Sequence, residues 1–238
     1  MRLTRIADIK ATLELLTGLH IGAGELEMRI GGVDNTVVKH PITQQPYIPG
    51  SSLKGRIRSL LEWRSGAVQE KPLGFKDMER AAGAQRAEVE RILMLFGLSG
   101  GDSLDESEAR RIGPTRVSLH DAPLAEDFVK EIVGSNLPLT EIKSENSINR
   151  ISGTALNPRQ TERVPAGARF SFRATLRVFE GDPELMPVLL QGLRLLELDS
   201  LGGSGSRGYG KLRFAGITCD GSSIESQFRA LDPFPVPA

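Results

Sequence analysis

The feature that most restricts the fold of this chain is a regular alternation of apolar and polar residues late in the sequence. Phe170, Phe172, Ala174, Leu176 and Val178 are each separated by a single polar or charged residue. Alternation with a period of two places every second side chain on the same face of a β-strand. We therefore expect a long strand there, in a sheet covered by other elements on one face and exposed to water on the other.

Three further segments are predicted to be strands. Shorter β-rich segments run from Thr115 to Asp121 and from Tyr209 to Ile217. Near the N-terminus, a segment that ends at Leu16 shows the same alternation as the long strand. Its apolar positions are Ile9, Ala11, Leu13 and Leu15.

A first helix is predicted shortly after the N-terminal strand. Apolar residues recur at helical spacing between Leu53 and Leu61, so one face of the helix should be buried. Ser51 or Ser52 is expected to cap its first N–H groups, and the helix should run to about Trp63.

A second helix is predicted after the long strand. It begins either at Asp182 and Pro183 or one turn later, near Pro187, because proline is favoured in the first turn of a helix. Gly202 and Gly203 are expected to end it. Its apolar face consists of Leu185, Leu189, Leu193 and Leu196.

The order of these elements is strand, helix, strand, strand, helix, strand, which is the split βαβ pattern. We predict an α+β fold with a ferredoxin-like (RRM-like) βαββαβ core, in a single domain spanning residues 1–238. Large insertions are expected at about 17–50, 65–114 and 122–167. The second insertion should hold a helix from Glu79 to Phe96 and an acidic, glycine-rich loop. Many unrelated functions use this architecture, so the fold alone does not reveal the chemistry.

Charge is balanced over the whole chain but not locally. Thirty basic and thirty acidic residues give a pI near 6.9, which is not the overall signature of a nucleic-acid binder. Between Lys143 and Arg177, however, seven basic residues stand against two acidic ones, whereas eight acidic residues stand against four basic ones between Gly101 and Glu131. Such segregation can steer a polyanion to one face of a neutral protein. Ordinary solvated surface charge is the alternative.

Cysteine content and hydropathy exclude several classes of protein. Cys219 is the single cysteine, so no intramolecular disulfide can form, and one cysteine with three scattered histidines offers no structural zinc site. No apolar run approaches the length of a membrane span, about 20 residues. The first ten residues lack the apolar stretch of a signal peptide. We expect a cytoplasmic protein that does not bind membranes.

The segment PYIPGSSLKGRIRSLLE, residues 46–62, places hydroxyl groups and backbone N–H groups at the predicted start of the first helix. A helix N-terminus favours a phosphate group. We therefore consider five residues as contacts to a sugar-phosphate chain: Ser51, Ser52, Lys54, Arg56 and Arg58. An ordinary capped helix with a solvated basic face is the alternative.

A glycine-rich segment near the C-terminus, Gly203 to Gly208, fits the pattern G-x-G-x-x-G. A dinucleotide-binding loop with this pattern follows a strand and opens a helix, whereas this one is predicted to follow a helix and lead into a strand. It still allows another backbone to approach closely, and Arg207 is available to a phosphate. A flexible turn between helix and strand is the alternative.

Four segments together carry a resemblance to a known family. The loop GGSGSRGYG before a final strand looks like the signature of the RAMP superfamily of CRISPR proteins. In order along the chain, LLTGLHIGAGE, IGGVDNTVVKHPITQQPYIPGSSLKGRIRSLLE, ENSINRISGTALNPRQTERVPAGARF and that loop resemble the backbone subunit of type III-A effector complexes. The resemblance covers nearly the whole chain except residues 66–113 and the C-terminal tail.

The resemblance implies a protein that polymerises along a guide RNA (crRNA) in several copies, together with other type III-A effector subunits, and contacts the paired target RNA. In that family an aspartate is required for cutting the target at regular intervals, and the resemblance implies that Asp34 is the matching residue here. A carboxylate in a glycine-rich loop can bind a divalent metal, so we expect Mg²⁺ or Mn²⁺ to assist cleavage, with Asp34 as a candidate ligand and no organic cofactor. His20, close to this loop in sequence, is expected to contact RNA.

The resemblance further implies that residues 17–50 form a catalytic loop and that residues 122–167 form a thumb-like element over the guide and target duplex, with lid-like insertions elsewhere. The expected RNA contacts of these parts and of the glycine-rich loop are Arg150, Arg159, Arg163, Gly205, Arg207 and Gly208. Ile151 or Leu156 is expected to wedge between base steps.

Alternatives remain at this point. Asp34 followed by Asn35 also fits an ordinary Asx-turn, in which case the chain is a catalytically silent RNA-binding scaffold. An enzyme that binds a small nucleotide through the glycine-rich loop is a third reading. A surface loop whose apolar residues pack locally is the alternative to the thumb-like element.

Overall fold

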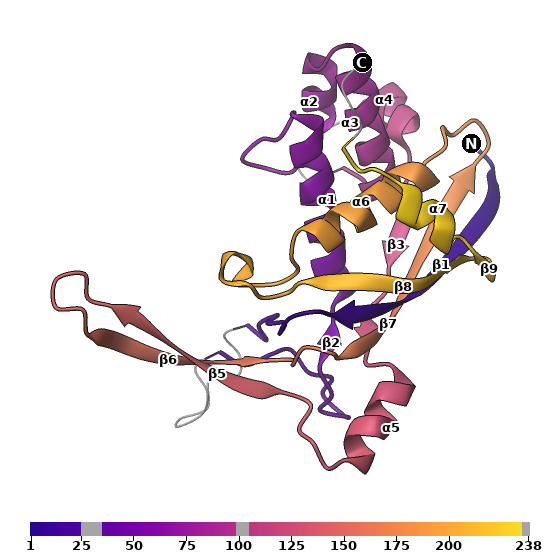
Figure 1. The fold of residues 1–238 in the computed structure, drawn as a ribbon. Helices are drawn as coiled ribbons and strands as arrows, with labels where there is room; N and C mark the ends of the chain where they lie inside the picture. Colours follow the sequence, from indigo (N-terminus) through magenta and orange to yellow (C-terminus); the bar gives the residue numbers. More distant parts are fainter. Residues whose placement is uncertain (25–34, 99–104, 235–238) are drawn as a thin grey trace.

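A computed structural model describes residues 1–24, 35–98 and 105–234 of the chain. Its centre is a five-stranded antiparallel sheet in the order β3-β7-β1-β8-β9. Most helices lie together on one side of this sheet, one helix lies apart near the bottom of the view, and a long two-stranded hairpin projects away from the body (Figure 1). The strands of the sheet are β1 (Leu3–Leu15), β3 (Val117–Leu119), β7 (Arg169–Phe179), β8 (Leu212–Cys219) and β9 (Ser222–Ser223).

The central pair of the sheet, β1 and β7, follows the predicted alternation. Leu13 lies opposite Phe170, and Ala7 lies opposite Leu176, and all four side chains are buried. The intervening side chains point to the other face of the sheet, where Asp8 forms an ion pair with Arg173. The predicted long strand and N-terminal strand are confirmed, with one buried face each.

Two long helices cover the buried face of the sheet. They are α1 (Gly50–Ser65) and α6 (Met186–Leu198), and their apolar sides join one hydrophobic core. The later of the two predicted starts of α6 is confirmed, because Pro187 lies in its first turn. The predicted caps of α1 are wrong: Pro49 occupies the N-cap, and the N–H of Gly50 donates to Oδ1 of Asp121 at 2.7 Å.

Between α1 and β3 the described part of the chain forms the helices α2 (Phe75–Arg80), α3 (Gly83–Phe96) and α4 (Glu106–Ile112). The single helix predicted from Glu79 to Phe96 is wrong in its first turn. The chain is extended at Ala81 and Ala82, which separates α2 from α3. The amphipathic character that motivated the prediction belongs to α3, whose apolar face is buried in the core.

The segment between β3 and β7 contains the hairpin. A short strand β4 (Ala122–Pro123) pairs with β2 (Tyr47–Ile48) beside the start of α1, and α5 (Glu126–Gly134) follows. The hairpin consists of β5 (Glu141–Ile148) and β6 (Ala155–Arg163), which extend beyond the body of the molecule (Figure 1). Most of its side chains are exposed, so the hairpin is not a locally packed loop.

A last helix, α7 (Glu225–Ala230), had no counterpart in the sequence prediction. Phe228 from this helix is fully buried and packs edge-on against Phe214 of β8. The core therefore extends to the C-terminal part of the chain. Among the helices in the described residues, none combines the length and apolarity needed to cross a bilayer.

Candidate functional site

The base of the hairpin is where three of the segments singled out in the sequence meet. Leu19 and Val164 exchange two backbone hydrogen bonds of 2.9 and 2.8 Å, which join the segment after β1 to the end of the hairpin. On its other side the same segment accepts from the N–H of Gly203 and of Gly210, each at 2.9 Å. Residues 17–22 are thus held between the hairpin and residues 199–211, which we call the glycine loop.

The glycine loop has a fixed backbone shape. Gly202, Ser204, Gly208 and Gly210 all have positive φ, between 64° and 83°. At Gly210 a Cβ atom would lie 1.9 Å from the backbone oxygen of Leu201, so only glycine fits there. The loop follows α6 and leads into β8, which is the reverse of the strand-loop-helix order of a dinucleotide-binding loop. The geometry therefore favours close approach of a backbone rather than a mononucleotide pocket.

Tyr209 anchors the glycine loop to the hairpin. Its side chain is fully buried, and its hydroxyl donates to Oε1 of Glu145 on β5 at 2.9 Å. Lys143 and Arg163 lie 4.5 and 4.9 Å from the centre of its ring, at the distance of cation–π contacts. Arg207 approaches the same Glu145 carboxylate at 3.6 Å. A basic cluster thus surrounds the junction of loop and hairpin.

The polar contacts at this junction shift two pKa values in opposite directions. The hydrogen bond from Tyr209, assisted by Arg207 and Lys143, lowers the pKa of the Glu145 carboxyl. Burial, followed by the hydrogen bond to Glu145, raises the pKa of the Tyr209 hydroxyl. The pair is therefore a charged acceptor with a neutral donor. Sequence reasoning assigned Tyr209 only to a strand, although an aromatic residue between two glycines was a signal of a fixed contact.

Glu162 ties the hairpin to the segment that contains residues 35–39. Its backbone N–H donates to the carbonyl of Asn35 at 2.9 Å, and its carboxylate accepts from the N–H of Val37 at 3.0 Å and from Nζ of Lys39 at 2.6 Å. Thr140 donates to the same carboxylate at 2.7 Å. Sequence reasoning missed this role of Glu162, because Asn35, Val37 and Lys39 lie more than a hundred residues before it in the chain.

The Glu162 carboxylate leads to a testable pH dependence. Burial alone would raise its pKa, but the hydrogen bonds from Lys39, Thr140 and Val37 outweigh burial, and the pKa of the carboxyl lies below its ordinary value of 4.5. A lowered folded-state pKa contributes stability that is present above 4.5 and is lost as the pH falls through the lower folded-state value. We expect the free energy of unfolding to fall less steeply with acidification in Glu162→Gln than in the parent protein, as measured by urea denaturation in a pH series.

Glu126 provides the control for this measurement. Its side chain is almost fully exposed, and its nearest basic partner, Lys130, is 4.0 Å away. The variant Glu126→Gln should follow the pH profile of the parent protein. If Glu162→Gln did so as well, the Glu162 contacts would not contribute to stability.

His20 lies beside both the hairpin and the glycine loop. Its Nδ1 is 2.7 Å from the backbone oxygen of Glu162. A carbonyl oxygen only accepts, so Nδ1 carries the proton and donates it. In the neutral ring this leaves Nε2 as an acceptor, near Gly22, on a half-buried side chain. His20 is therefore placed to accept a hydrogen bond from a hydroxyl, including a ribose 2′-hydroxyl.

Asp34, the predicted catalytic residue and candidate metal ligand, lies outside the described residues. The described chain resumes at Asn35, which the hairpin base holds through Glu162. Within the residues that the structure describes, no group of three or more histidine, cysteine, aspartate or glutamate side chains could hold a metal ion.

The start of α1 differs from the phosphate site that its sequence suggested. The Asp121 carboxylate already occupies the first N–H of the helix, and its negative charge opposes a phosphate on the helix axis. Ser51 is exposed, and Ser52 and Lys54 are half-buried, to the side of this point. Burial, together with the charge of Arg58, lowers the pKa of the Lys54 amine.

Two predicted phosphate contacts on α1 are bound to other parts of the protein. Arg58 is 13% exposed and donates to Glu62 and to the carbonyls of Leu73 and Gly97, which corrects its expected position on an open basic face. Arg56 forms an ion pair with Asp199 and stacks 5.2 Å from the ring centre of Trp63.

Arg56 has a second contact that concerns the glycine loop. Its Nε donates to the carbonyl of Ser200 at 3.0 Å. Together with the ion pair to Asp199, this contact links α1 to the beginning of the loop. Arg56 thus supports the loop rather than facing solvent as a free cation.

The three arginines that the sequence singled out on the hairpin lie at different distances from its base. Arg163 is at the base, paired with Glu141 at 2.7 Å, whereas Arg159 and Arg150 are exposed farther along the strand and at the tip. Ile151, at the tip, is 99% exposed, and Leu156 is less exposed. The structure thus brings Arg163, His20 and the glycine loop together and leaves Arg150 and Arg159 apart from them.

Comparisons with known proteins indicate the family of the chain. A family model described as the RAMP superfamily matches residues 12–213. The chain is 39% identical over 230 residues to a protein of Methanothermobacter thermautotrophicus named CRISPR system Cms endoribonuclease Csm3, covering 91% of this chain and 86% of that protein. It is 37% identical over 240 residues to the protein of that name from Mycobacterium tuberculosis, covering 92% and 93%.

A solved structure gives the same indication. The fold is similar to one in the crystal structure of a Csm3–Csm4 subcomplex of the type III-A CRISPR-Cas interference complex, with a TM-score of 0.54 and 26% sequence identity. The match covers 97% of this chain and 86% of the other. The family model, the relatives and the shared fold lead to one conclusion: the chain belongs to the RAMP superfamily and, within it, to the Csm3 family.

Proposed function

We propose that the protein is the crRNA-binding backbone subunit of a type III-A CRISPR effector complex and an endoribonuclease that cuts the complementary target RNA at regular intervals. The observation that carries this proposal is the junction at the hairpin base, where the glycine loop, the segment around His20 and the basic end of the hairpin meet. The curated relatives carry the name endoribonuclease, and the solved relative was crystallised with another effector subunit. Partners are accordingly crRNA, target RNA, further copies of the chain and other type III-A subunits.

The sheet supports a ferredoxin-like core within one domain. β3, β7, β1 and β8 lie side by side in that order, with α1 between β1 and β3 in the chain and α6 between β7 and β8. This is the arrangement of two interlocked βαβ units. We assign the parts outside this core to the insertions expected from the sequence.

The guide is proposed to run along the glycine loop and past the start of α1. Gly205 and Gly208 allow its sugar-phosphate chain to approach the backbone of the loop, and Arg207, half-exposed beside them, pairs with a phosphate. Arg163 and His20 continue this surface at the hairpin base. Ser51, Ser52 and Lys54 extend it beside α1, displaced from the helix axis by the Asp121 carboxylate.

The hairpin is proposed to act as the thumb over the guide and target duplex. Its tip is a defined turn, because Oδ1 of Asn149 accepts from the N–H groups of Ile151 and Ser152 at 2.9 and 3.1 Å. The turn presents Ile151 to solvent, where an apolar side chain can wedge between base steps. Arg150 and Arg159 are placed for phosphates on either side.

Cleavage is proposed to depend on Asp34. A divalent ion, Mg²⁺ or Mn²⁺, bound with the help of this carboxylate would neutralise negative charge at the scissile phosphate. The described residues contribute positioning: Glu162 fixes the segment that starts at Asn35, and His20 donates to the carbonyl of Glu162.

Two substitutions on α1 separate RNA binding from folding. Lys54→Ala is expected to weaken guide binding regardless of RNA sequence. It should also reduce the slope of log affinity against log salt concentration by about the contribution of one phosphate contact. Arg58→Ala should instead cost about 3–5 kcal/mol of folding stability, because it leaves the buried Glu62 carboxylate without its charged partner. RNA affinity over a salt series and urea denaturation measure the two effects.

Two results would contradict this part of the proposal. Unchanged affinity and an unchanged salt slope in Lys54→Ala would place the guide elsewhere. Arg58 would again be a phosphate contact if RNA binding by folded Arg58→Ala depended less on salt than binding by the parent protein. This affinity is measured far below the unfolding midpoint of the variant.

A further inference from the structure

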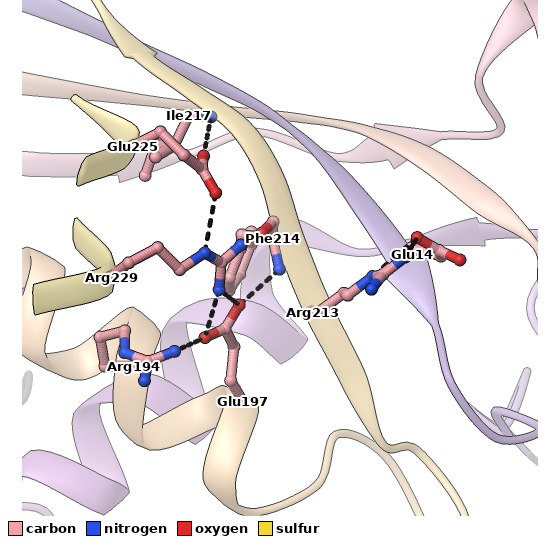
Figure 2. Close-up of polar contacts among 8 residues, drawn as sticks. All are labelled: Glu14, Arg194, Glu197, Arg213, Phe214, Ile217, Glu225 and Arg229. Carbon is pink, nitrogen blue, oxygen red and sulfur yellow. Dashed lines mark hydrogen bonds and ion pairs between the residues drawn. The ribbon is translucent and has the colours of Figure 1, made fainter. Parts of the chain in front are cut away.

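A buried carboxylate joins the two ends of the glycine loop. Glu197 lies in the last turn of α6, just before the loop, and Oε1 of its side chain accepts from the backbone N–H of Phe214 at 2.7 Å. Phe214 lies near the start of β8, just after the loop. Figure 2 shows this carboxylate pointing from the helix to the strand. The side chain of Glu197 is only 6% exposed.

Two arginines hold this carboxylate in place. Arg194, one turn earlier on α6, forms an ion pair with it, and Arg229 of α7 donates to it at 3.0 Å. Arg229 also donates to the carbonyl of Phe214 and to Glu225, as Figure 2 shows. Helix, strand and C-terminal helix therefore meet at one charged group, where its hydrogen bonds are protected from water.

The contacts of Glu197 matter for the glycine loop because the loop is rich in glycine. Five glycines between Gly202 and Gly210 give the segment little intrinsic stiffness, so its conformation depends on where its ends are fixed. Contacts at the start, such as Arg56 with Asp199, hold one end to α1. The N–H of Leu201 donates to the carbonyl of Gly210 at 3.0 Å, which joins the two ends directly. The Glu197 carboxylate adds two links: it accepts from the N–H of Phe214, and it binds Arg229, which also donates to the carbonyl of Phe214.

We infer that Glu197 is a positioning residue: its charge holds Arg229 against the carbonyl of Phe214, helps to fix the ends of the glycine loop and so presents Arg207 and the loop backbone to the RNA phosphates. The inference rests on the proposed function, since it requires the loop to contact RNA. It assigns to Glu197 an effect on RNA affinity that goes beyond its contribution to folding.

Glu197→Gln tests this inference, because the amide keeps the size of the side chain and an oxygen for the N–H of Phe214 but removes the charge that holds both arginines. RNA affinity is measured for the parent, Glu197→Gln, Arg207→Ala and the double variant, in the assembled complex and far below every unfolding midpoint. We expect each single variant to bind about tenfold more weakly, as for the loss of one charge-assisted contact. The double variant should also be about tenfold weaker, rather than about a hundredfold, because both changes remove the same contact.

Glu225→Gln is the matched control. Glu225 belongs to the same cluster, where it binds Arg229 and the N–H of Ile217, but it does not contact either end of the loop. It should lower the unfolding midpoint and leave RNA affinity unchanged. If Glu197→Gln does not fold, Arg194→Met, which removes one partner of the carboxylate, is measured in its place.

Three outcomes are decisive. Parent-like affinity in Glu197→Gln, or losses that multiply in the double variant, would overturn the positioning role while the proposed RNA contact stands. Parent-like affinity in Arg207→Ala would overturn the contact between loop and RNA, and the inference with it. If the losses in RNA affinity do not multiply in the double variant, and Glu225→Gln binds RNA like the parent, both the contact between loop and RNA and the positioning role of Glu197 are supported.

Discussion

Replacing Asp34 by alanine is expected to abolish target cleavage while guide binding persists. Cleavage of a complementary RNA by the reconstituted complex should slow by about a hundredfold or more, as for the loss of a catalytic proton-transfer group or metal ligand. The guide should stay bound, because its proposed contacts lie at the glycine loop, the hairpin base and α1. The measurement is the ladder of regularly spaced target fragments, together with the crRNA retained by the complex.

Asp34→Asn separates the possible roles of the carboxylate. It keeps the size of the side chain and its ability to form an Asx-turn, but it removes the charge. If both variants are inactive, the charge is required, and titration with Mg²⁺ or Mn²⁺ reports on metal binding. If both variants cut at the parent rate with guide bound, the assignment of catalysis to Asp34 is wrong.

Gly210→Ala is expected to have the largest effect on folding of any single methyl group added to the glycine loop. Its Cβ atom would lie 1.9 Å from the backbone oxygen of Leu201 and 2.9 Å from the carbonyl carbon, and backbone atoms cannot move aside as a side-chain end can. The residue also has a φ of 71°. We expect a loss of about 3–5 kcal/mol in the free energy of unfolding, at the upper end for point substitutions, together with weakened RNA binding.

Gly208→Ala is the control for Gly210→Ala. Its φ is 83°, in the same left-handed region, but no atom lies within 4 Å of the added Cβ. Only the conformational penalty applies, about 1–2 kcal/mol. Equal losses in the two variants, measured by urea denaturation, would show that the loop relaxes around Gly210 and that its shape is not fixed by close packing.

The elements predicted most accurately from the sequence are those whose periodicity is imposed by burial. The apolar residues between Phe170 and Val178 and the leucines of α6 face the same core, so the spacing of apolar residues alone identifies the type of element and its buried face. Element ends were predicted less well. Asp121 binds the first N–H of α1 from a segment distant in sequence, and this left Ser51 and Ser52 without a capping role.

The candidate site could be predicted as a set of segments but not as a set of contacts. The glycine loop, His20 and Arg163 were singled out by sequence and lie together in the structure. Arg58 has the same charge and helical spacing as Lys54, but its donors are taken by Glu62 and two carbonyls. Local patterns cannot show which cation finds an internal partner, because those partners come from other parts of the fold.

The outer edge of β8 also bears on how copies of the chain can meet. Between Phe214 and Ile217 its outward backbone groups are bonded to side chains of Glu197, Arg229 and Glu225, and β9 covers only the last part of the strand. An open strand edge invites pairing with an edge of another molecule. Because these side chains already bind the outward backbone groups from Phe214 to Ile217, this part of the edge is protected against pairing with the sheet of a second molecule.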